Sequence, residues 1–274
     1  MSRLKLLTTI VTLILTLPIV TSCLNSGEPS EVVQAHFAEV QYAGMGQICF
    51  VDAAGVKLFP TSQSILALEA KGLRFDEGIA FIQYSIVPQP NNDGLGVPAG
   101  YSIDLIGAAI INRDFIYTST GGPEDLISTA PVSSLDRVLD SNNELFIMNN
   151  RYLILSVNYY LGATSDGKPK PHHFAVTYKN DETTPGSTSL KLYLRHDSEG
   201  DTSTQYYSAI TGNVTLYCMS FDLKQAIDHF KTTTGKEEFI VSLTADIADE
   251  FSQELVNAEQ REYTVTYKST ASQD

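Results

Sequence analysis

The sequence predicts an all-β protein, in which a small OB-like five-stranded barrel is followed by an antiparallel β-sandwich with one short helix. Short runs in which apolar and polar residues alternate fill most of the chain, as is typical of strands with one buried face. In the first half three such runs precede a helical pattern and two follow it, which is the element order of small OB barrels. We expect the barrel within residues 32–130 and the sandwich within 131–270. A connector with several Gly and Pro residues spans 112–135, and the boundary is expected near Ala130.

The first three predicted strands are short. They are the runs "AEVQY", "QICFV" and "VKLF", and in the first of them Ala38, Val40 and Tyr42 share one face. The next segment, "TSQSILALEAKG", breaks the two-residue period and contains helix formers. We therefore expect a short helix there, with Gly72 placed to end it.

Two longer strands complete the predicted barrel. They are "IAFIQYSIV" and "YSIDLIGAAII", joined by an irregular, exposed loop with the sequence "PQPNNDGLGVPAG". Across Gly107, the residues expected on one face of the second strand are Tyr101, Ile103, Leu105 and Ala109.

The second half contains longer and cleaner alternation. The runs are "RYLILSVNYYLG", "HHFAVTYK", "SLKLYLRH", "NVTLYCMSF", "EFIVSL" and "EYTVTYK". Each run predicts a strand with one buried and one solvent-exposed face, as in an antiparallel sandwich.

One helix interrupts this half. Asp222 is the expected N-cap of "LKQAIDHF", and Gly235 is the expected stop. The apolar stripe at helical spacing consists of Leu223, Ala226, Ile227 and Phe230. A later segment, "ADIADEFSQELVNAEQ", fits either a helix or a loop that lengthens a hairpin.

Residues 1–22 have the pattern of a secretory signal. Arg3 and Lys5 precede an apolar run from 6 to 20, which is short for a membrane span of ~20 residues. The following "VTSC" looks like a bacterial lipobox, which implies cleavage before Cys23 and acylation of that residue. The alternative is an ordinary cleaved signal with an incidental cysteine. Residues 23–31 are expected to form a short flexible tether.

A triacylated Cys23 would hold the body of the protein to a membrane leaflet, because each buried methylene contributes about 0.8 kcal/mol. We expect the outer membrane as the location. The tether carries only Glu28 and Glu31, so it gives a weak export signal, and the periplasmic face and the cell surface both remain open.

The composition argues against nucleic acid as a partner. The formal net charge is −14, and removal of the leader with Arg3 and Lys5 makes the chain more negative still. Binding of single-stranded nucleic acid needs a cationic groove with stacking aromatics. An acidic chain repels both nucleic acid and anionic lipid. The remaining cysteines, Cys49 and Cys218, could pair outside the cytoplasm, but we expect two separate small buried residues.

Two groups of polar residues are candidate metal ligands. His172 and His173 are neighbours in a strand and point to opposite faces, so we expect one wet and one packed histidine. After His196, the acids of "HDSEGD" (Asp197, Glu199 and Asp201) alternate like calcium ligands, but the glycine precedes the third acid. A polar hairpin turn is the preferred interpretation, and no metal or cofactor is predicted.

Paired tyrosines are the remaining candidates for a binding surface. In Tyr159-Tyr160 and Tyr206-Tyr207 one ring of each pair should face out, where it could anchor a partner or stack on a sugar. The preferred interpretation is that they are ordinary sandwich residues. The chain has no G-x-S-x-G, H-E-x-x-H or C-x-x-C motif, so no catalytic residue is predicted, although a triad assembled from distant residues remains open.

The lipobox, the barrel-then-sandwich order and the late run "LYLRHDSEGD…FDL…YTVTYK" resemble the NigD-like lipoproteins of Gram-negative gut and oral anaerobes. The turn from Leu194 to Asp201 carries the resemblance most specifically. The family name derives from a bacteriocin gene cluster, so the resemblance implies an immunity-like role and brings no catalytic residues with it. We expect a non-enzymatic, lipid-anchored envelope protein that binds a protein partner or toxin. The alternatives are a glycan- or small-ligand-binding lipoprotein and, third, a hydrolase.

Overall fold

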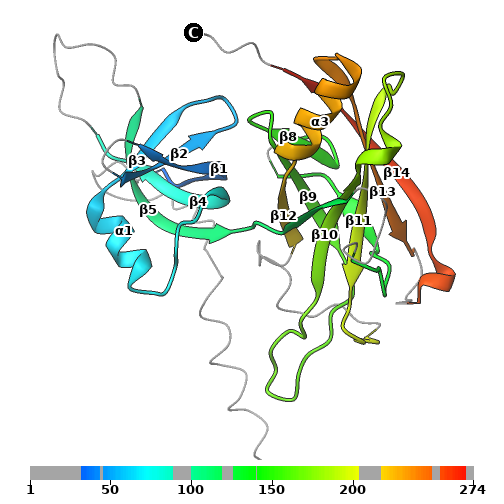
Figure 1. Cartoon of the computed structure of the whole chain (residues 1–274). Helices are drawn as coiled ribbons and strands as arrows, with labels where there is room; N and C mark the ends of the chain where they lie inside the picture. The colour runs from blue at the N-terminus through cyan, green and yellow to red at the C-terminus, as the bar shows by residue number, and fades with distance from the viewer. Residues whose placement is uncertain are drawn as a thin grey trace, which may run out of the picture. The chain divides into compact units, whose positions relative to one another are not determined.

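The computed structural model describes residues 32–43, 46–88, 100–118, 126–139, 141–203, 217–248 and 254–269. In these residues the chain forms a closed five-stranded barrel and two further sheets, with two α-helices (Figure 1). The predicted all-β class with an OB-like barrel is confirmed.

The barrel has the strand order β1-β2-β3-β5-β4, and β4 pairs back with β1 to close it. All neighbours are antiparallel except β3 and β5, which run parallel. The strands are β1 (Gln34–Ala43), β2 (Gln47–Asp52), β3 (Lys57–Pro60), β4 (Gly78–Ile86) and β5 (Tyr101–Ile110).

The predicted helix of the first half is α1 (Ser62–Glu69), between β3 and β4. Thr61 caps it, because the Thr61 Oγ1 accepts a hydrogen bond from the Ser64 N–H at 3.3 Å. Leu68 is buried in the barrel core. Gly72 follows with a φ of +88°, a conformation that glycine adopts without strain, so the predicted stop is confirmed.

The prediction for the faces of β5 is wrong beyond its middle. Gln83 pairs with Gly107 but Tyr84 pairs with Leu105, so the register contains a β-bulge. The extra residue reverses which side chains face inward, because side chains alternate with a strict period of two. Ala108, rather than Ala109, therefore packs against the barrel core.

Two tyrosines at the ends of the predicted faces are half-exposed. Tyr42 and Tyr101 continue the faces of Val40 and Ile103, and they are 51% and 52% exposed. Tyr101 lies at the start of β5, whereas Tyr42 lies near the end of β1 and donates its hydroxyl hydrogen to the Phe75 carbonyl.

Gly78 permits a close clamp at the start of β4. The Asn112 Oδ1 accepts from the Ile79 N–H at 2.8 Å, and the Asn112 Nδ2 donates to the Glu77 carbonyl at 3.1 Å. Gly78 has a φ of +135°, and a Cβ built on it would lie 2.2 Å from the Asn112 amide nitrogen. The clamp therefore requires glycine at this position.

Gly78→Ala is expected to lower the free energy of unfolding by about 1–3 kcal/mol, because it strains the backbone and displaces a doubly bonded amide. Urea denaturation followed by circular dichroism would measure this. Gly186→Ala is the matched control, since no atom lies within 4 Å of its built Cβ. Equal stability of the two variants would contradict the clamp.

The second half forms two sheets that pack face to face. One has the order β14-β13-β11-β10-β6, and the other has the order β12-β9-β7 with β8 also paired to β9. Their strands are β6 (Asp114–Thr118), β7 (Ser134–Asp136), β8 (Leu145–Met148), β9 (Tyr152–Asn158), β10 (His173–Lys179), β11 (Ser189–Asp197), β12 (Cys218–Asp222), β13 (Glu238–Ile247) and β14 (Glu259–Lys268). Two 3₁₀ turns, η2 (Asn180–Glu182) and η3 (Leu255–Asn257), accompany them.

The sheets are not purely antiparallel, which corrects that detail of the prediction. β10 runs parallel to β6, and β11 runs parallel to β13. Alternation along a strand reports one buried face and carries no information on the direction of its neighbour. The strand β6 lies on the barrel side of the expected boundary near Ala130, yet it pairs with the large sheet. The domain limits themselves remain predictions.

The main core lies between the two sheets. Inward residues of β9, such as Leu153 and Leu155, share one cluster with inward residues of β10, β11 and β13. The alternate residue Ile154 belongs to a different cluster, together with Phe37 and Ile79 of barrel strands. The small sheet is therefore buried on both faces.

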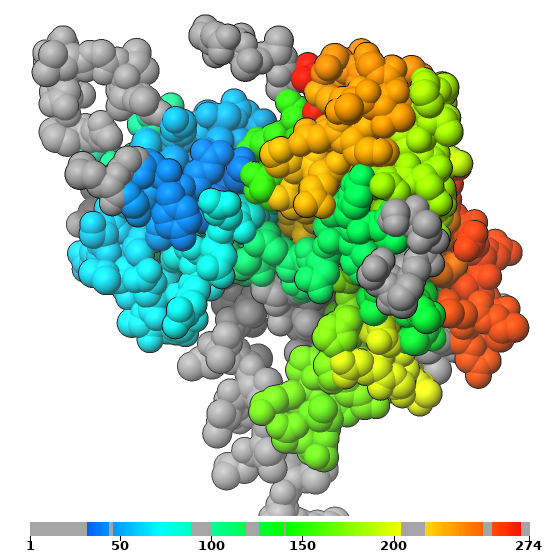
Figure 2. All heavy atoms as spheres, in the orientation of Figure 1, coloured from blue at the N-terminus to red at the C-terminus, as the bar shows by residue number. Residues whose placement is uncertain are grey.

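The helix α3 (Lys224–Thr234) confirms the second helical prediction. Its whole predicted stripe is buried, and Gly235 ends it with a φ of +69°. The N-cap is Leu223, one residue later than expected, but the Asp222 carboxylate still accepts from the Lys224 N–H at 3.0 Å. The segment that contains α3, orange in Figure 2, lies at the surface, and residues such as Lys224 and Asp228 are exposed there.

The ambiguous segment closes a hairpin. Ile247 of β13 pairs with Glu259 of β14, so the residues between them connect two antiparallel strands. Phe251, part of the alternative helical stripe, lies outside the described residues.

Candidate functional site: a buried histidine–aspartate cluster and the outer face of the large sheet

Several predicted functional residues lie outside the described part of the chain. They are Cys23 with its signal and tether, and the pair Tyr206-Tyr207. Within the ranges that the structure describes, no helix is both long enough and apolar enough to cross a membrane.

His172 and His173 lie on opposite sides of the chain, as predicted. The His172 side chain is 1% exposed, whereas that of His173 is 59% exposed. His172 immediately precedes β10, and His196 is the residue of β11 that pairs with Phe174. The fold thereby brings two histidines together that are far apart in the sequence.

The two histidines and Asp201 form a hydrogen-bonded chain. The His196 Nδ1 lies 3.1 Å from the Pro131 carbonyl oxygen, so this nitrogen carries the proton. The His196 Nε2 lies 2.8 Å from the His172 Nδ1. A neutral His172 carries one N–H, so it can donate to only one of its two neighbours, His196 or Asp201. The His172 Nε2 lies 3.2 Å from the Asp201 Oδ2, at the other end of the chain. We refer to His172, His196 and Asp201 as the His–Asp cluster.

Asp201 is the charged member of this cluster and accepts most of its hydrogen bonds. Its side chain is 1% exposed and its Oδ1 accepts from the Lys170 Nζ at 2.8 Å. Backbone N–H groups of Gly162 and Ser203 also donate to it, at 2.5 and 3.1 Å. Burial alone would raise the pKa of Asp201, but these hydrogen bonds and that of His172 outweigh burial and hold the pKa at about 2.

The histidines are held neutral by their surroundings. Burial and the neighbouring His172 lower the pKa of His196 to about 3. Its ring stacks on that of Phe174 with centroids 4.3 Å apart, and Tyr159 covers an edge. Burial also lowers the pKa of His172, and the Asp201 carboxylate offsets only part of that effect.

The geometry of the His–Asp cluster supports a structural role. Both ring nitrogens of His196 bond to protein groups, and the His172 and Asp201 side chains are almost fully buried. A catalytic base needs a free nitrogen within reach of substrate. The cluster instead ties the chain at Pro131 and Gly162 to the end of β11.

The acids of the predicted polar turn bind three different partners. The Asp197 Oδ1 accepts from Thr129 at 2.7 Å, Glu199 lies 2.5 Å from the exposed His173, and Asp201 belongs to the His–Asp cluster. The backbone makes a tight turn in which Glu199 and Gly200 have φ angles of +48° and +76°. The three carboxylates therefore point to different partners and not to a common site. The residues form a polar turn, which was the preferred interpretation.

The prediction that one ring of Tyr159-Tyr160 faces out is wrong. Tyr159 and Tyr160 are 4% and 7% exposed. They follow the last residue of β9, so the alternation of the strand no longer applies to them, and Tyr159 packs against the histidines. They are ordinary sandwich residues, which was the preferred interpretation.

A tyrosine that the sequence analysis did not single out lies on the outer face of the large sheet. Leu192 and Leu194 of β11 are buried in the core, so Tyr193 between them faces outward. Lys179 and Arg195 lie over its ring, with the Lys179 Nζ and the Arg195 Cζ at 4.8 and 5.3 Å from the centroid. We call Tyr193, Lys179 and Arg195 the tyrosine platform.

The Tyr193 hydroxyl is fixed as well. It donates to the Glu182 Oε2 at 2.5 Å. Burial and this carboxylate raise the pKa of Tyr193 to about 12, so the hydroxyl is protonated at neutral pH. The alternation of "SLKLYLRH" could have identified this residue, because its leucines mark the buried face.

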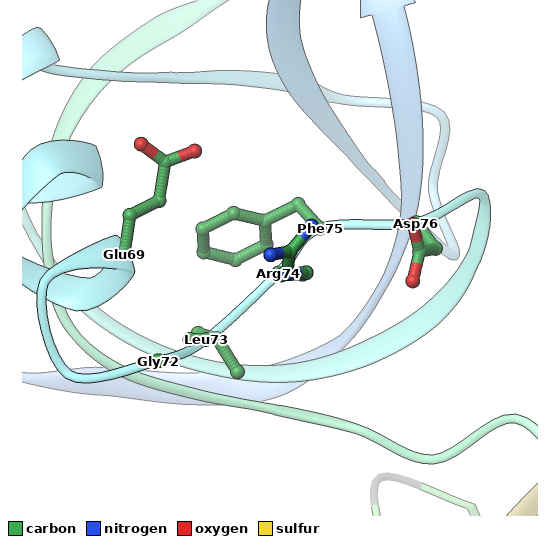
Figure 3. A pocket seen from close by; sticks show the side chains of 6 residues that line it. All are labelled: Glu69, Gly72, Leu73, Arg74, Phe75 and Asp76. Carbon is green, nitrogen blue, oxygen red and sulfur yellow. The ribbon is translucent and has the colours of Figure 1, made fainter.

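The barrel carries an open hollow of about 410 Å³ beside the end of α1. Glu69 comes from the helix, and Gly72, Leu73, Arg74, Phe75 and Asp76 come from the chain that follows it (Figure 3). The Phe75 ring is buried in the barrel core, whereas the charged residues of both signs line the opening.

Cys49 and Cys218 are both free and buried, so the preferred interpretation of two separate residues is confirmed. Burial raises the pKa of Cys218 to about 11, which keeps the thiol protonated.

Comparison with known proteins identifies no matching family model and no curated relative. Solved structures do match. A candidate lipoprotein from Bacteroides fragilis NCTC 9343 is 20% identical with a TM-score of 0.65, and the match covers 88% of this chain and all of the other. A NigD-like immunity protein from Bacteroides caccae ATCC 43185 is 14% identical with a TM-score of 0.52, covering 86% and 99%.

A candidate toxin-related protein from Parabacteroides distasonis ATCC 8503 also matches, at 15% identity and a TM-score of 0.55 over 87% of this chain and 94% of the other. None of these three structures is described as an enzyme. At these identities the likeness establishes a shared fold, so the resemblance to NigD-like proteins holds at the level of fold.

Proposed function

We propose that this chain is a lipid-anchored, non-enzymatic protein of the cell envelope that binds a protein partner. Two kinds of support lead to this proposal. The lipobox-like "VTSC" ends in Cys23, and solved structures with the same fold are described as a lipoprotein and an immunity protein. The buried His–Asp cluster offers no accessible base, which supports binding rather than catalysis.

The observation that carries the binding proposal is the tyrosine platform. Tyr and Arg are enriched among the residues that dominate protein interfaces, because they combine a large rigid surface with hydrogen-bonding groups. Here Tyr193 is oriented before any partner arrives, by Glu182 and by two cations. Such preorganisation reduces the entropy lost on binding.

A crosslinked pull-down from native membranes tests this function. The bait is the tagged full-length chain, compared with Tyr193→Ala and with Cys23→Ala. We expect one protein near one-to-one with the parent bait. Tyr193→Ala should weaken its capture by about 30-fold, since an interface anchor contributes at least ~2 kcal/mol. Cys23→Ala should leave the bait in the soluble fraction and lose the partner.

Lys268→Ala is the matched control, because Lys268 is an exposed cation on the edge strand of the same sheet. It should capture as much partner as the parent. A partner that binds Tyr193→Ala as well as the parent would remove the platform from the proposal. Recovery of no protein, with the bait on the membrane, would favour a glycan or a diffusible ligand.

The hollow in the barrel favours small-ligand binding as the second candidate. Glu69, Arg74 and Asp76 present charges of both signs at an open site, which suits a small polar molecule such as a glycan fragment. Calorimetric titration with cell-wall and dietary glycans would test this. Heat that is lost in Arg74→Ala would support the hollow as the site, and no heat with any glycan would reject it.

A further inference from the structure

One end of the barrel presents apolar side chains at its mouth. On β4, Ile82 and Tyr84 face the barrel core, and Ile86 continues the same row while being 42% exposed. On β5, Ile103 and Leu105 face the core, and Tyr101 continues their row while being 52% exposed. Both rows thus run past the point where the barrel covers them.

These two side chains lie on neighbouring strands at the same end. Ile86 pairs with Ile103, and Tyr101 is the next residue of the same row on β5. We call Ile86 and Tyr101 the apolar rim. They are diagonal neighbours on one face of the sheet, and such neighbours lie about 7–8 Å apart, within reach of an aromatic side chain.

The opposite end of the barrel is closed. The helix α1 and the chain that follows it cover this end, with Leu68 of the helix and Phe75 of that chain buried in the barrel core. Tyr42, at that end of β1, donates its hydroxyl hydrogen to the Phe75 carbonyl. Leu66, on the outward side of α1, is 64% exposed. The rim therefore marks the one barrel mouth that lacks such a cover among the described residues.

The chain enters the barrel at the rim. The first residue of β1, Gln34, pairs with Tyr84 near the end of β4, and Val33 just before it is 50% exposed. If Cys23 is acylated, the residues from 24 to 33 connect the lipid to this end of the barrel. Fully extended, they reach at most ~35 Å.

We propose that the apolar rim rests on the lipid surface to which the chain is anchored, so that the barrel mouth with Ile86 and Tyr101 contacts the membrane. This inference depends on the proposed lipid at Cys23. A lipid anchor restricts the body to the region just above the leaflet, and Tyr is favoured at a membrane interface because its ring is apolar and its hydroxyl is polar. Because an acidic chain is repelled by anionic lipid, an uncharged lipid surface suits this contact better.

Tryptophan fluorescence tests the contact directly, since the chain contains no Trp. Tyr101→Trp places one reporter on the rim. The full-length, lipidated variant is reconstituted on phosphatidylcholine vesicles, with and without bromine on the acyl chains. We expect brominated lipid to reduce the emission about twofold, because an interfacial side chain lies ~5–10 Å into the headgroup and acyl boundary.

Leu66→Trp is the matched control, with an exposed reporter on α1. Its emission should be the same on both kinds of vesicle. Flotation of the vesicles and the acyl mass on Cys23 are measured on the same samples, and the urea midpoint confirms that each variant folds.

The outcomes separate the two proposals. Quenching of the Tyr101→Trp reporter alone supports the rim contact. A chain that floats with its acyl groups but shows no quenching overturns the rim contact and leaves the anchor intact. If the emission changes only when a captured protein is added, the rim binds that protein, and the proposed contact with lipid is overturned. A chain without acyl mass that does not float overturns the anchor, and the rim contact with it.

Discussion

Asp201→Ala is expected to lower the free energy of unfolding by about 3–5 kcal/mol, the range for removing one partner of a buried ion pair. The Asp201 carboxylate is 1% exposed and accepts from Lys170 and from two backbone N–H groups, and its Oδ2 lies 3.2 Å from the His172 Nε2. Its loss leaves these donors without an acceptor in a space that water barely reaches. Lys170 is 39% exposed and can turn to solvent, so the two backbone N–H groups account for most of the loss.

Urea denaturation at neutral pH measures this effect. Glu199→Gln is the control, because it alters a carboxylate in the same turn whose contact with His173 is exposed, the two side chains being 59% (His173) and 42% (Glu199) exposed. We expect the control to change stability by less than about 1 kcal/mol. If Asp201→Ala lowers the free energy of unfolding by no more than the control does, the His–Asp cluster does not stabilise the fold.

The second large effect is a loss of stability in acid that comes from the histidines. The pKa of His196 is about 3 in the folded protein, against 6.5 for an ordinary histidine. The unfolded chain therefore binds more protons between these values. The contribution of His196 to the free energy of unfolding is fully present above pH 6.5, and it decreases as the pH falls toward 3. The lowered pKa of His172 acts in the same direction.

Asp201 adds to this loss at lower pH. Its folded pKa of about 2 lies below the ordinary value of 3.8. A carboxylate with a lowered pKa stabilises the fold above its unfolded pKa, and that contribution disappears as the pH falls from about 4 toward 2.

Urea midpoints measured from pH 7.5 down to 4 would test the histidine effect. His196→Phe removes the titrating group while keeping a ring against Phe174. It should be less stable at pH 7.5, because the contacts of the His196 ring nitrogens with Pro131 and His172 are lost, and its stability should fall less steeply with acid. Leu194→Ala is the control, since it removes a buried neighbour on the same strand without altering a titrating group. It should keep the slope of the parent, and a parent without any slope above pH 4 would contradict the assignment.

The sequence by itself determined the class of the fold and the order of the barrel elements. Alternation predicts strands because a side chain on every second residue must be buried, and this rule is local. The stops at Gly72 and Gly235 are also local, since each follows a helical pattern and takes a positive φ. The lipobox at Cys23 is a property of the sequence alone and remains a prediction.

Only the tertiary structure decided which strands are neighbours and in which direction they run. Parallel pairing of β11 with β13 leaves the alternation of both strands unchanged, so the sequence cannot report it. The bulge near Gly107 likewise depends on the partner strand, and it moved Ala109 off the buried row. The His–Asp cluster is the clearest case, because His172 and His196 are 24 positions apart and meet through the pairing of β10 with β11. Burial patterns encode one face of each element, whereas hydrogen bonds between distant residues are fixed only when the elements pack.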